Sequence, residues 1–157
     1  MGMVVSFDVD DTLVCDRSVP TEPSAPWLFR LWFNEPLRRG ARDLMRELIR
    51  LDCKLWIYTT SFRDPLYLKL WFRSLGVRLA GVVNQTVHDR VVKPMPFRGY
   101  TPSKYPPAFG IDMHVDDSEG VGEEGRRHGF SVVVVRPDDV GWTATVLDAV
   151  HSQRGAR

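Results

Sequence analysis

The sequence predicts an α/β protein, a three-layer α/β/α sandwich built around a central parallel sheet. Short apolar runs with the composition of buried strands alternate along the chain with longer segments of helical periodicity. Strands that follow one another through helices pair in parallel, and the helices then cover both faces of the sheet. The chain has 157 residues, of which 43% are hydrophobic and 26% charged, so we expect a single domain over residues 1–157 with one sizeable core.

Five apolar runs are the expected strands. They lie within residues 3–7, 54–58, 81–85, 112–118 and 131–137. The first of them, MVVSF, begins almost at the start of the chain and ends directly before a group of carboxylates. Each run is short enough for a strand that is buried in a parallel sheet.

Two longer helices are expected between the first three strands. Apolar residues recur at helical spacing over residues 37–49, so this segment should present one face to the core. Residues 64–76 carry the signals of a helix with defined ends: Asp64 as N-cap, Pro65 at the first helical position and Gly76 where the helix stops.

The remaining segments are shorter. Residues 123–129 and 142–150 are expected as helices, and residues 152–157 should fray. Residues 15–26 contain Pro and Ser and form an expected loop, whereas residues 27–33, WLFRLWF, are too aromatic for a plain linker in water.

Charge and composition exclude several kinds of partner. A formal net charge of +1 gives no long-range field that would attract nucleic acid or an acidic membrane. No stretch approaches the roughly 20 apolar residues of a membrane span, and no secretion signal is recognisable at the start. Cys15 and Cys53 have no disulfide pattern and are expected as free thiols. We therefore expect a cytoplasmic protein.

Three polar clusters follow three of the expected strands. They are residues 8–12, 59–61 and 116–118. Ligands of such sheets bind outside the carboxyl ends of the strands, so the clusters should converge on one edge. Crowded carboxylates repel one another unless a cation or protons neutralise them. A hard divalent ion with oxygen ligands, above all Mg²⁺, fits this composition.

The ordered clusters resemble the motifs of the haloacid dehalogenase (HAD) superfamily. FDVDDTLV at residues 7–14 resembles the first motif, IYTTS at residues 57–61 the second and VDDS at residues 115–118 the fourth. The third is a lysine between the second and the fourth. Order and approximate spacing match from residue 3 to about residue 135. The resemblance implies the Rossmann-like HAD fold and a Mg²⁺-dependent phosphohydrolase that acts on a phosphomonoester through an aspartyl-phosphate.

The resemblance also implies catalytic roles. Asp8 would be the nucleophile that attacks phosphorus. Asp10 would protonate the leaving oxygen and then deprotonate the hydrolytic water, while its backbone carbonyl binds the metal. Thr59 would hydrogen-bond a phosphoryl oxygen. The dehalogenases of the family lack the second aspartate, so the presence of Asp10 favours phosphoryl transfer.

Metal and substrate residues follow from the same motifs. The implied metal-binding residues are Asp8, Asp10, Asp117 and Asp116. Of these, Asp117 fits the main ligand of the fourth motif, and Asp116 is a second ligand or an outer-shell partner. The candidate substrate-binding residues are Asp11, Thr12, Thr60, Ser61 and Arg63. Asp11 stands where many members have Gly. Arg63 could reach a substrate anion, and the alternative is that it is an exposed arginine at the start of a helix.

Two lysines compete for the third motif, whose ammonium would stabilise the charge on Asp8 and on the phosphoryl group. Motif spacing favours Lys104 over Lys93, and the alternative is that both are solvated loop residues. The histidines share no metal-binding spacing and are expected to be structural or exposed; they are His88, His114, His128 and His151.

Neither gap between the motifs has room for a full cap domain. The first holds a short, flap-like insertion at about residues 14–36, so the chain resembles the capless Mg²⁺-dependent phosphatases of the family. Their open site suits a small phosphorylated molecule or an exposed phosphoryl group on a macromolecule. The aromatic residues of the insertion either form a flap over the metal or pack against the sheet; they are Trp27, Phe29, Trp32 and Phe33.

Two other functions remain compatible with the residues. One is a receiver-like signalling module that holds phosphate on an aspartate, and the other is an inactive scaffold of the same fold. A receiver has no need of Asp10 as an acid, and the presence of every expected catalytic residue type disfavours a scaffold. The lifetime of the acyl-phosphate separates an enzyme from a receiver.

Overall fold

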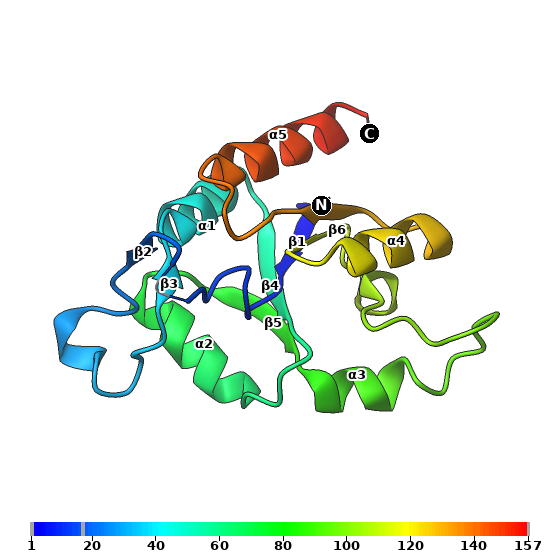
Figure 1. The fold of residues 1–157 in the computed structure, drawn as a ribbon, viewed down its shortest axis with the longest axis horizontal. Helices are drawn as coiled ribbons and strands as arrows, with labels where there is room; N and C mark the ends of the chain where they lie inside the picture. The colour runs from blue at the N-terminus through cyan, green and yellow to red at the C-terminus, as the bar shows by residue number, and fades with distance from the viewer. Residues whose placement is uncertain (1, 17, 157) are drawn as a thin grey trace.

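The computed structural model describes residues 2–16 and 18–156 (Figure 1). Five strands form one sheet in the order β5-β4-β1-β6-β7, and every neighbouring pair is parallel. The strands are β1 (Val4–Phe7), β4 (Lys54–Tyr58), β5 (Leu79–Val83), β6 (Met113–Asp116) and β7 (Val132–Val134). All five overlap the predicted runs, and the α/β fold class is confirmed. The third run is offset, because β5 ends at Val83 and the last two residues of the predicted run, 84 and 85, cap and begin α3.

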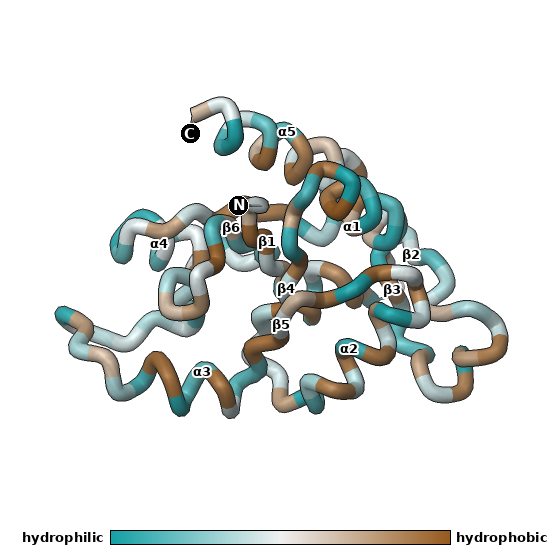
Figure 2. The backbone as a smooth tube through the Cα atoms, turned by 180° about the vertical axis from the view of Figure 1, so that it is seen from behind, coloured by the Kyte–Doolittle hydropathy of each residue, from teal (hydrophilic) through white to brown (hydrophobic). Residues whose placement is uncertain are grey.

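Helices connect and cover the strands. They are α1 (Ala41–Arg50), α2 (Pro65–Ser74), α3 (Gln85–Val91), α4 (Glu119–His128) and α5 (Trp142–Gly155), with short 3-10 helices η1 (Trp27–Phe29) and η2 (Pro106–Phe109). Helix α1 packs on β4 and on α5. Helix α4 packs on β7, the strand at one edge of the sheet. Hydrophobic residues gather in the central strands and alternate with hydrophilic ones along the helices (Figure 2).

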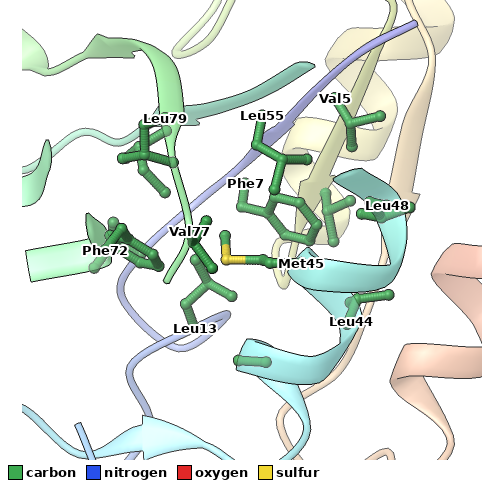
Figure 3. Close-up of a cluster of buried hydrophobic side chains, with 14 of the residues drawn as sticks. Val5, Phe7, Leu13, Leu44, Met45, Leu48, Leu55, Phe72, Val77 and Leu79 are labelled. Atoms are coloured by element: carbon green, nitrogen blue, oxygen red, sulfur yellow. The ribbon is translucent and has the colours of Figure 1, made fainter. Parts of the chain in front are cut away.

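The main core lies between one face of the sheet and α1, α2 and α5. Phe7 of β1 is fully buried beside Met45 and Leu48 of α1 (Figure 3). Successive residues of a strand point to opposite faces, so Ser6 faces the other side. A smaller cluster around Tyr58 occupies that second face, which also receives the polar residues of the site described below.

The first helix begins later than its periodicity predicts. Leu37 and Arg38 do not belong to α1 but form the short strand β3 (Leu37–Arg38), which pairs antiparallel with β2 (Thr21–Glu22). The Glu22 carboxylate accepts hydrogen bonds from the backbone N–H groups of Gly40 and Arg42 at 2.9 Å. This cap comes from a distant segment, so local periodicity does not reveal it.

Helix α2 follows its predicted signals closely. The Asp64 side chain accepts hydrogen bonds from the backbone N–H groups of Leu66 and Tyr67, and Pro65 is the first helical residue. Gly76 adopts a positive φ of 77° just after the helix end, a conformation that glycine adopts without strain.

The remaining helices differ from the expectation at their ends. Helix α3 was not predicted; Asn84 caps it by accepting from the N–H of Val87 at 3.0 Å. Helix α4 starts at Glu119 rather than at residue 123. Helix α5 continues to Gly155, so the expected fraying after residue 152 is wrong up to there, while residue 157 lies outside the described residues.

The part of the insertion that follows β2, within residues 23–36, folds beside α2 (Figure 1). Ser24 fixes this segment with two hydrogen bonds. Its hydroxyl donates to the Phe33 carbonyl at 2.7 Å within the insertion, and its own carbonyl accepts from Trp71 Nε1 of α2 at 2.6 Å. Phe33 is buried in the core and contacts the ring of Tyr67. The other aromatic residues of the insertion are exposed; they are Trp27, Phe29 and Trp32.

Both cysteines are free thiols, as expected. Among the described residues, no helix combines the length and apolar character that crossing a membrane requires.

Candidate active site

Carboxylates collect where the strand order of the sheet reverses. The chain places β4 and β5 on one side of β1 and then returns to place β6 and β7 on the other side. Asp8 directly follows β1, and Asp116 ends the neighbouring strand β6. The crevice outside the carboxyl ends of strands at such a reversal is the usual ligand site of open α/β sheets.

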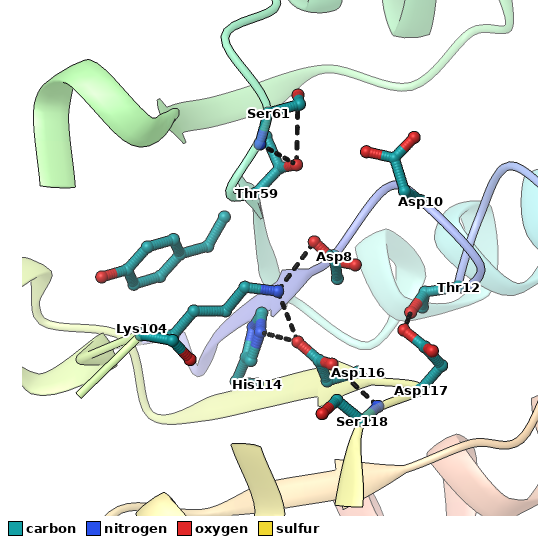
Figure 4. Close-up of polar contacts among 12 residues, drawn as sticks. Asp8, Asp10, Thr12, Thr59, Ser61, Lys104, His114, Asp116, Asp117 and Ser118 are labelled. Carbon is teal, nitrogen blue, oxygen red and sulfur yellow. Dashed lines mark hydrogen bonds and ion pairs between the residues drawn. The ribbon is translucent and has the colours of Figure 1, made fainter. Parts of the chain in front are cut away.

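A buried lysine lies between two of these carboxylates (Figure 4). Lys104 Nζ is 2.7 Å from Asp8 Oδ1 and 2.5 Å from Asp116 Oδ2, and the Lys104 side chain is only 3% exposed. Lys93, by contrast, is an exposed residue that pairs with Asp89 in the adjacent turn of chain. Of the two lysines considered for the third motif, the structure brings Lys104 to the acidic cluster.

The two aspartates bound by Lys104 differ in their electrostatics. Burial raises the pKa of Asp8 to about 6, against the lowering effect of Lys104. Burial acts in the same direction on Asp116, but the hydrogen bonds from His114 and Lys104 outweigh it and hold the pKa of Asp116 well below its usual value. Asp116 is therefore a fixed anion, whereas a cation beside Asp8 would keep that carboxylate ionised.

His114 belongs to the site, although its sequence context predicted only a structural or exposed residue. Burial lowers its pKa to about 4, so the ring is neutral near pH 7. Its Nε2 lies 2.9 Å from Asp116 Oδ2 and must donate to that carboxylate, which leaves Nδ1 to accept from the Ser6 hydroxyl at 2.8 Å. This chain of hydrogen bonds fixes the orientation of the Asp116 side chain.

The donor set is compatible with a metal ion. Asp8, Asp116 and Asp117 each offer a carboxylate oxygen, and these oxygens lie within 4.8 Å of one another. Burial, with the nearby charge of Asp116, raises the pKa of Asp117, a crowding that a cation would relieve. Hard oxygen ligands are those that Mg²⁺ prefers.

Asp116 and Asp117 are engaged differently by the protein. Asp116 Oδ2 contacts both Lys104 and His114, and Oδ1 accepts from the Ser118 N–H at 2.9 Å. Asp117 accepts from the Thr12 hydroxyl at 3.2 Å through Oδ1. A carboxylate has about four lone-pair sites, so Asp117 keeps more of them for a metal. The geometry favours Asp117 as a direct ligand and Asp116 as an outer-shell partner.

Residues at the end of β4 face the acidic cluster from the neighbouring strand (Figure 4). Thr59 is fully buried, and its hydroxyl exchanges hydrogen bonds with Ser61, accepting from the N–H at 3.1 Å and donating to Oγ at 3.2 Å. Thr60 is exposed. The turn thus presents hydroxyl and N–H groups of the kind that bind a phosphoryl oxygen.

The candidate residues on the loop after β1 lie in different environments. Thr12 is fully buried and donates its hydroxyl hydrogen bond to Asp117, so it holds a carboxylate of the acidic cluster rather than facing solvent. Asp11 is exposed and has a positive φ of 60°, a conformation that glycine adopts more readily. Arg63 binds the carboxylates of Asp10 and Glu35, with closest contacts of 2.8 Å and 2.6 Å.

No described protein family and no curated protein matches the sequence. Among solved structures, the chain is similar to a protein from Porphyromonas gingivalis described as a predicted HAD-like family hydrolase, with a TM-score of 0.50 and 11% identity over 96% of this chain and 98% of the other. The two chains share a fold. At this identity the likeness concerns the HAD-like fold alone, and activity has to be argued from the site.

Within this HAD-like fold, a second set of residues holds the loop that carries Lys104, here called the lysine loop. The sequence analysis did not predict these residues. The buried Glu124 carboxylate accepts from the N–H groups of Ser103 and Lys104 and from the Ser103 hydroxyl. The Tyr58 hydroxyl accepts from the N–H of Tyr105 at 2.8 Å. These contacts join α4 and β4 to the loop that carries Lys104.

One of the unpredicted residues, His114, could have been found from its position in the sequence. His114 and Asp116 are two positions apart on a strand, so they share a face of the sheet. Glu124 had no comparable signal, because an acidic residue on a short helix is most often solvated.

Proposed function

We propose that the chain is a Mg²⁺-dependent HAD-type phosphatase that hydrolyses phosphomonoesters through an aspartyl-phosphate on Asp8. The observation that carries this proposal is the buried ammonium of Lys104 between Asp8 and Asp116, beside the third carboxylate of Asp117. A single ammonium does not balance this cluster, so a phosphoryl dianion would be repelled without a further cation. Divalent Mg²⁺ bound by Asp8, Asp117 and the Asp10 carbonyl, with Asp116 behind them, would supply that charge and align the phosphoryl group.

Each residue then has a definite task. An Asp8 oxygen forms a bond to phosphorus while the bond from phosphorus to the leaving oxygen breaks, and Asp10 gives that oxygen its proton. Water next attacks the aspartyl-phosphate, Asp10 takes its proton, and Asp8 and inorganic phosphate are released. Lys104 stabilises the negative charge that is shared between Asp8 and the phosphoryl group.

The proposed substrate is a small phosphomonoester or an exposed phosphoryl group on a macromolecule. This proposal is supported by the small number of helices and strands in the two gaps between the motifs. The first gap holds the β2 segment and η1, and the second holds two helices, a strand and η2. This suits a capless member with an open site. The proposal includes a cytoplasmic location, which the free thiols of Cys15 and Cys53 suit.

The test is hydrolysis of 4-nitrophenyl phosphate with Mg²⁺ and with excess chelator, followed by a screen of phosphorylated metabolites, peptides and nucleic-acid ends. Turnover should require Mg²⁺, and Ca²⁺ should inhibit because its looser coordination misplaces the nucleophile. Asp8→Asn should abolish turnover and phosphate labelling. Undiminished turnover in chelator would contradict the proposal. A labelled Asp8 that persists without turnover would identify a receiver instead.

A further inference from the structure

Arg63 joins two carboxylates from different parts of the chain. Its Nη1 and Nη2 atoms each donate to one oxygen of Asp10, both at 2.8 Å, which is an end-on fork. Its Nε and Nη2 atoms donate to Glu35 from the side, at 3.1 Å and 2.6 Å. One guanidinium therefore orients both carboxylates.

Arg63 is itself anchored. Tyr67 donates from its hydroxyl to Glu35 Oε1 at 3.2 Å, and Asn84 Nδ2 donates to the Arg63 carbonyl at 3.1 Å. The side chains of Arg63 and Glu35 are 22% and 23% exposed, whereas that of Asp10 is 52% exposed. A half-exposed carboxylate is thus held by a partly buried guanidinium whose backbone and partner are both fixed.

These contacts leave Arg63 poorly suited to receive the substrate phosphoryl group, the role considered for it from the sequence. A guanidinium has five N–H donors, and the two forks engage both Nη2 donors, the Nε donor and one Nη1 donor. Its single positive charge also faces the carboxylates of Asp10 and Glu35 together.

We propose that Arg63 is a positioning residue that holds the Asp10 carboxylate where it exchanges a proton with the leaving oxygen, and that Glu35 fixes Arg63 for this task. The inference rests on the proposed phosphatase function. In Figure 4, Asp10 stands on the loop after β1, toward Ser61 and apart from the Lys104–Asp116 pair. A carboxylate free to rotate would spend less time near the reacting oxygen, and such misplacement is costly.

This role gives the insertion a function other than covering the site. Glu35 lies at the end of the insertion, and its contact with Arg63 transmits the position of that segment to Asp10. The exposed aromatic residues of the insertion take no part in this connection. The insertion would act on proton transfer through a chain of charges.

The test compares four proteins in the presence of Mg²⁺: wild type, Arg63→Gln, Asp10→Asn and the double variant. The substrates are 4-nitrophenyl phosphate, whose leaving group needs no proton, and glycerol 2-phosphate, whose leaving group does. Arg63→Gln should lower kcat on glycerol 2-phosphate by about 10–100-fold, with little change on the aryl ester and in KM. The double variant should match Asp10→Asn, because Arg63 acts through Asp10. Glu35→Gln should show the same selectivity more weakly.

Two further variants sharpen the comparison. Arg50→Gln is the matched control, because Arg50 donates to Glu47 at 2.8 Å on an exposed part of α1, and its removal should leave all rates unchanged. Arg63→Lys keeps the charge without the fork and should remain impaired on glycerol 2-phosphate. It also serves as the test variant if Arg63→Gln does not fold.

Either of two kinetic results would overturn the assignment. A raised KM for both substrates with unchanged kcat would show that Arg63 binds the substrate, and losses that multiply in the double variant would show that it acts independently of Asp10. A wild type that hydrolyses neither of these substrates nor any compound of the phosphate-ester screen would reject the phosphatase function and the positioning role with it. In that case, a lower free energy of unfolding in urea for Arg63→Gln and Asp10→Asn than for the wild type would show that the Arg63–Asp10 contact serves stability alone.

Discussion

Lys104 Nζ lies 2.7 Å from Asp8 Oδ1, which places a cation from the loop before β6 against the residue that follows β1. The same ammonium contacts Asp116, and all three side chains are nearly inaccessible to solvent. A buried group of this kind costs most when one partner is removed, because the remaining charges are left uncompensated.

Lys104→Met should therefore destabilise the protein and lower turnover. The expected loss is about 3–5 kcal/mol in the free energy of unfolding at pH 7.5, measured by urea unfolding without Mg²⁺. Lys93→Met is the matched control, because Lys93 is exposed and pairs with Asp89, four residues earlier in the chain, so the change should stay within about 0.5 kcal/mol. Equal losses in the two variants would remove the distinction between the lysines.

Asp117→Asn and Asp116→Asn should separate a metal ligand from its support. Without Mg²⁺, Asp117→Asn should keep or raise the unfolding temperature, because it relieves the crowding of carboxylates. Asp116→Asn should lower it, because Lys104 and His114 lose a charged acceptor, at a cost of about 1–3 kcal/mol. Added Mg²⁺ should stabilise the wild type and fail to stabilise Asp117→Asn. Identical Mg²⁺ responses in both variants would contradict the assignment.

Glu124→Gln should weaken the site through the backbone of the loop that carries Lys104. The carboxylate accepts from the Ser103 N–H, the Ser103 hydroxyl and the Lys104 N–H, and an amide has a single acceptor oxygen for these donors. We expect a loss of about 1–3 kcal/mol in stability and a lower kcat, measured by urea unfolding and phosphatase assays. The neighbouring Glu123 is exposed, so Glu123→Gln is the control and should change neither quantity. A Glu124→Gln protein that behaves like this control would show that the lysine loop holds itself in place.

His88 should make stability depend on pH. The Tyr58 hydroxyl lies 2.6 Å from His88 Nδ1, within hydrogen-bond distance, and the same hydroxyl accepts from the Tyr105 N–H. Burial lowers the pKa of His88, against a raising effect of Asp89, and Glu124 also raises it while Lys93 and Lys104 lower it. The unfolded chain therefore binds more protons, and this contribution to stability is present above the ordinary histidine pKa and is lost as the pH falls through the folded value.

The measurement is urea unfolding of wild type and His88→Asn between pH 7.5 and 5. Asparagine offers an acceptor in place of Nδ1 but does not titrate in this range. The wild type should lose more stability toward pH 5 than the variant does. Parallel curves for the two proteins would show that His88 does not titrate on unfolding.

The motif residues show how far a sequence can lead. Asp8, Thr59 and Asp116 were placed at the ends of strands because apolar runs precede them, and parallel strands bring their carboxyl ends to one edge. The fold class followed from the same alternation of runs. Helix α2 was predicted with its cap because Asp64 and Pro65 act on the turn that contains them.

Contacts between distant segments decided the rest. Glu22 starts α1 from another strand, Glu124 orients the lysine loop from a helix, and Glu35 reaches Arg63 from the insertion. Each is an acidic residue with no local signal, and a solvated carboxylate is the commonest state of such a residue. Local periodicity was enough to predict the five strands of the main sheet and the α/β fold class, and the motif aspartates followed from their resemblance to the HAD motifs. Which charges meet could not be predicted from the sequence, because an ion pair depends on distances that are set only when the chain folds.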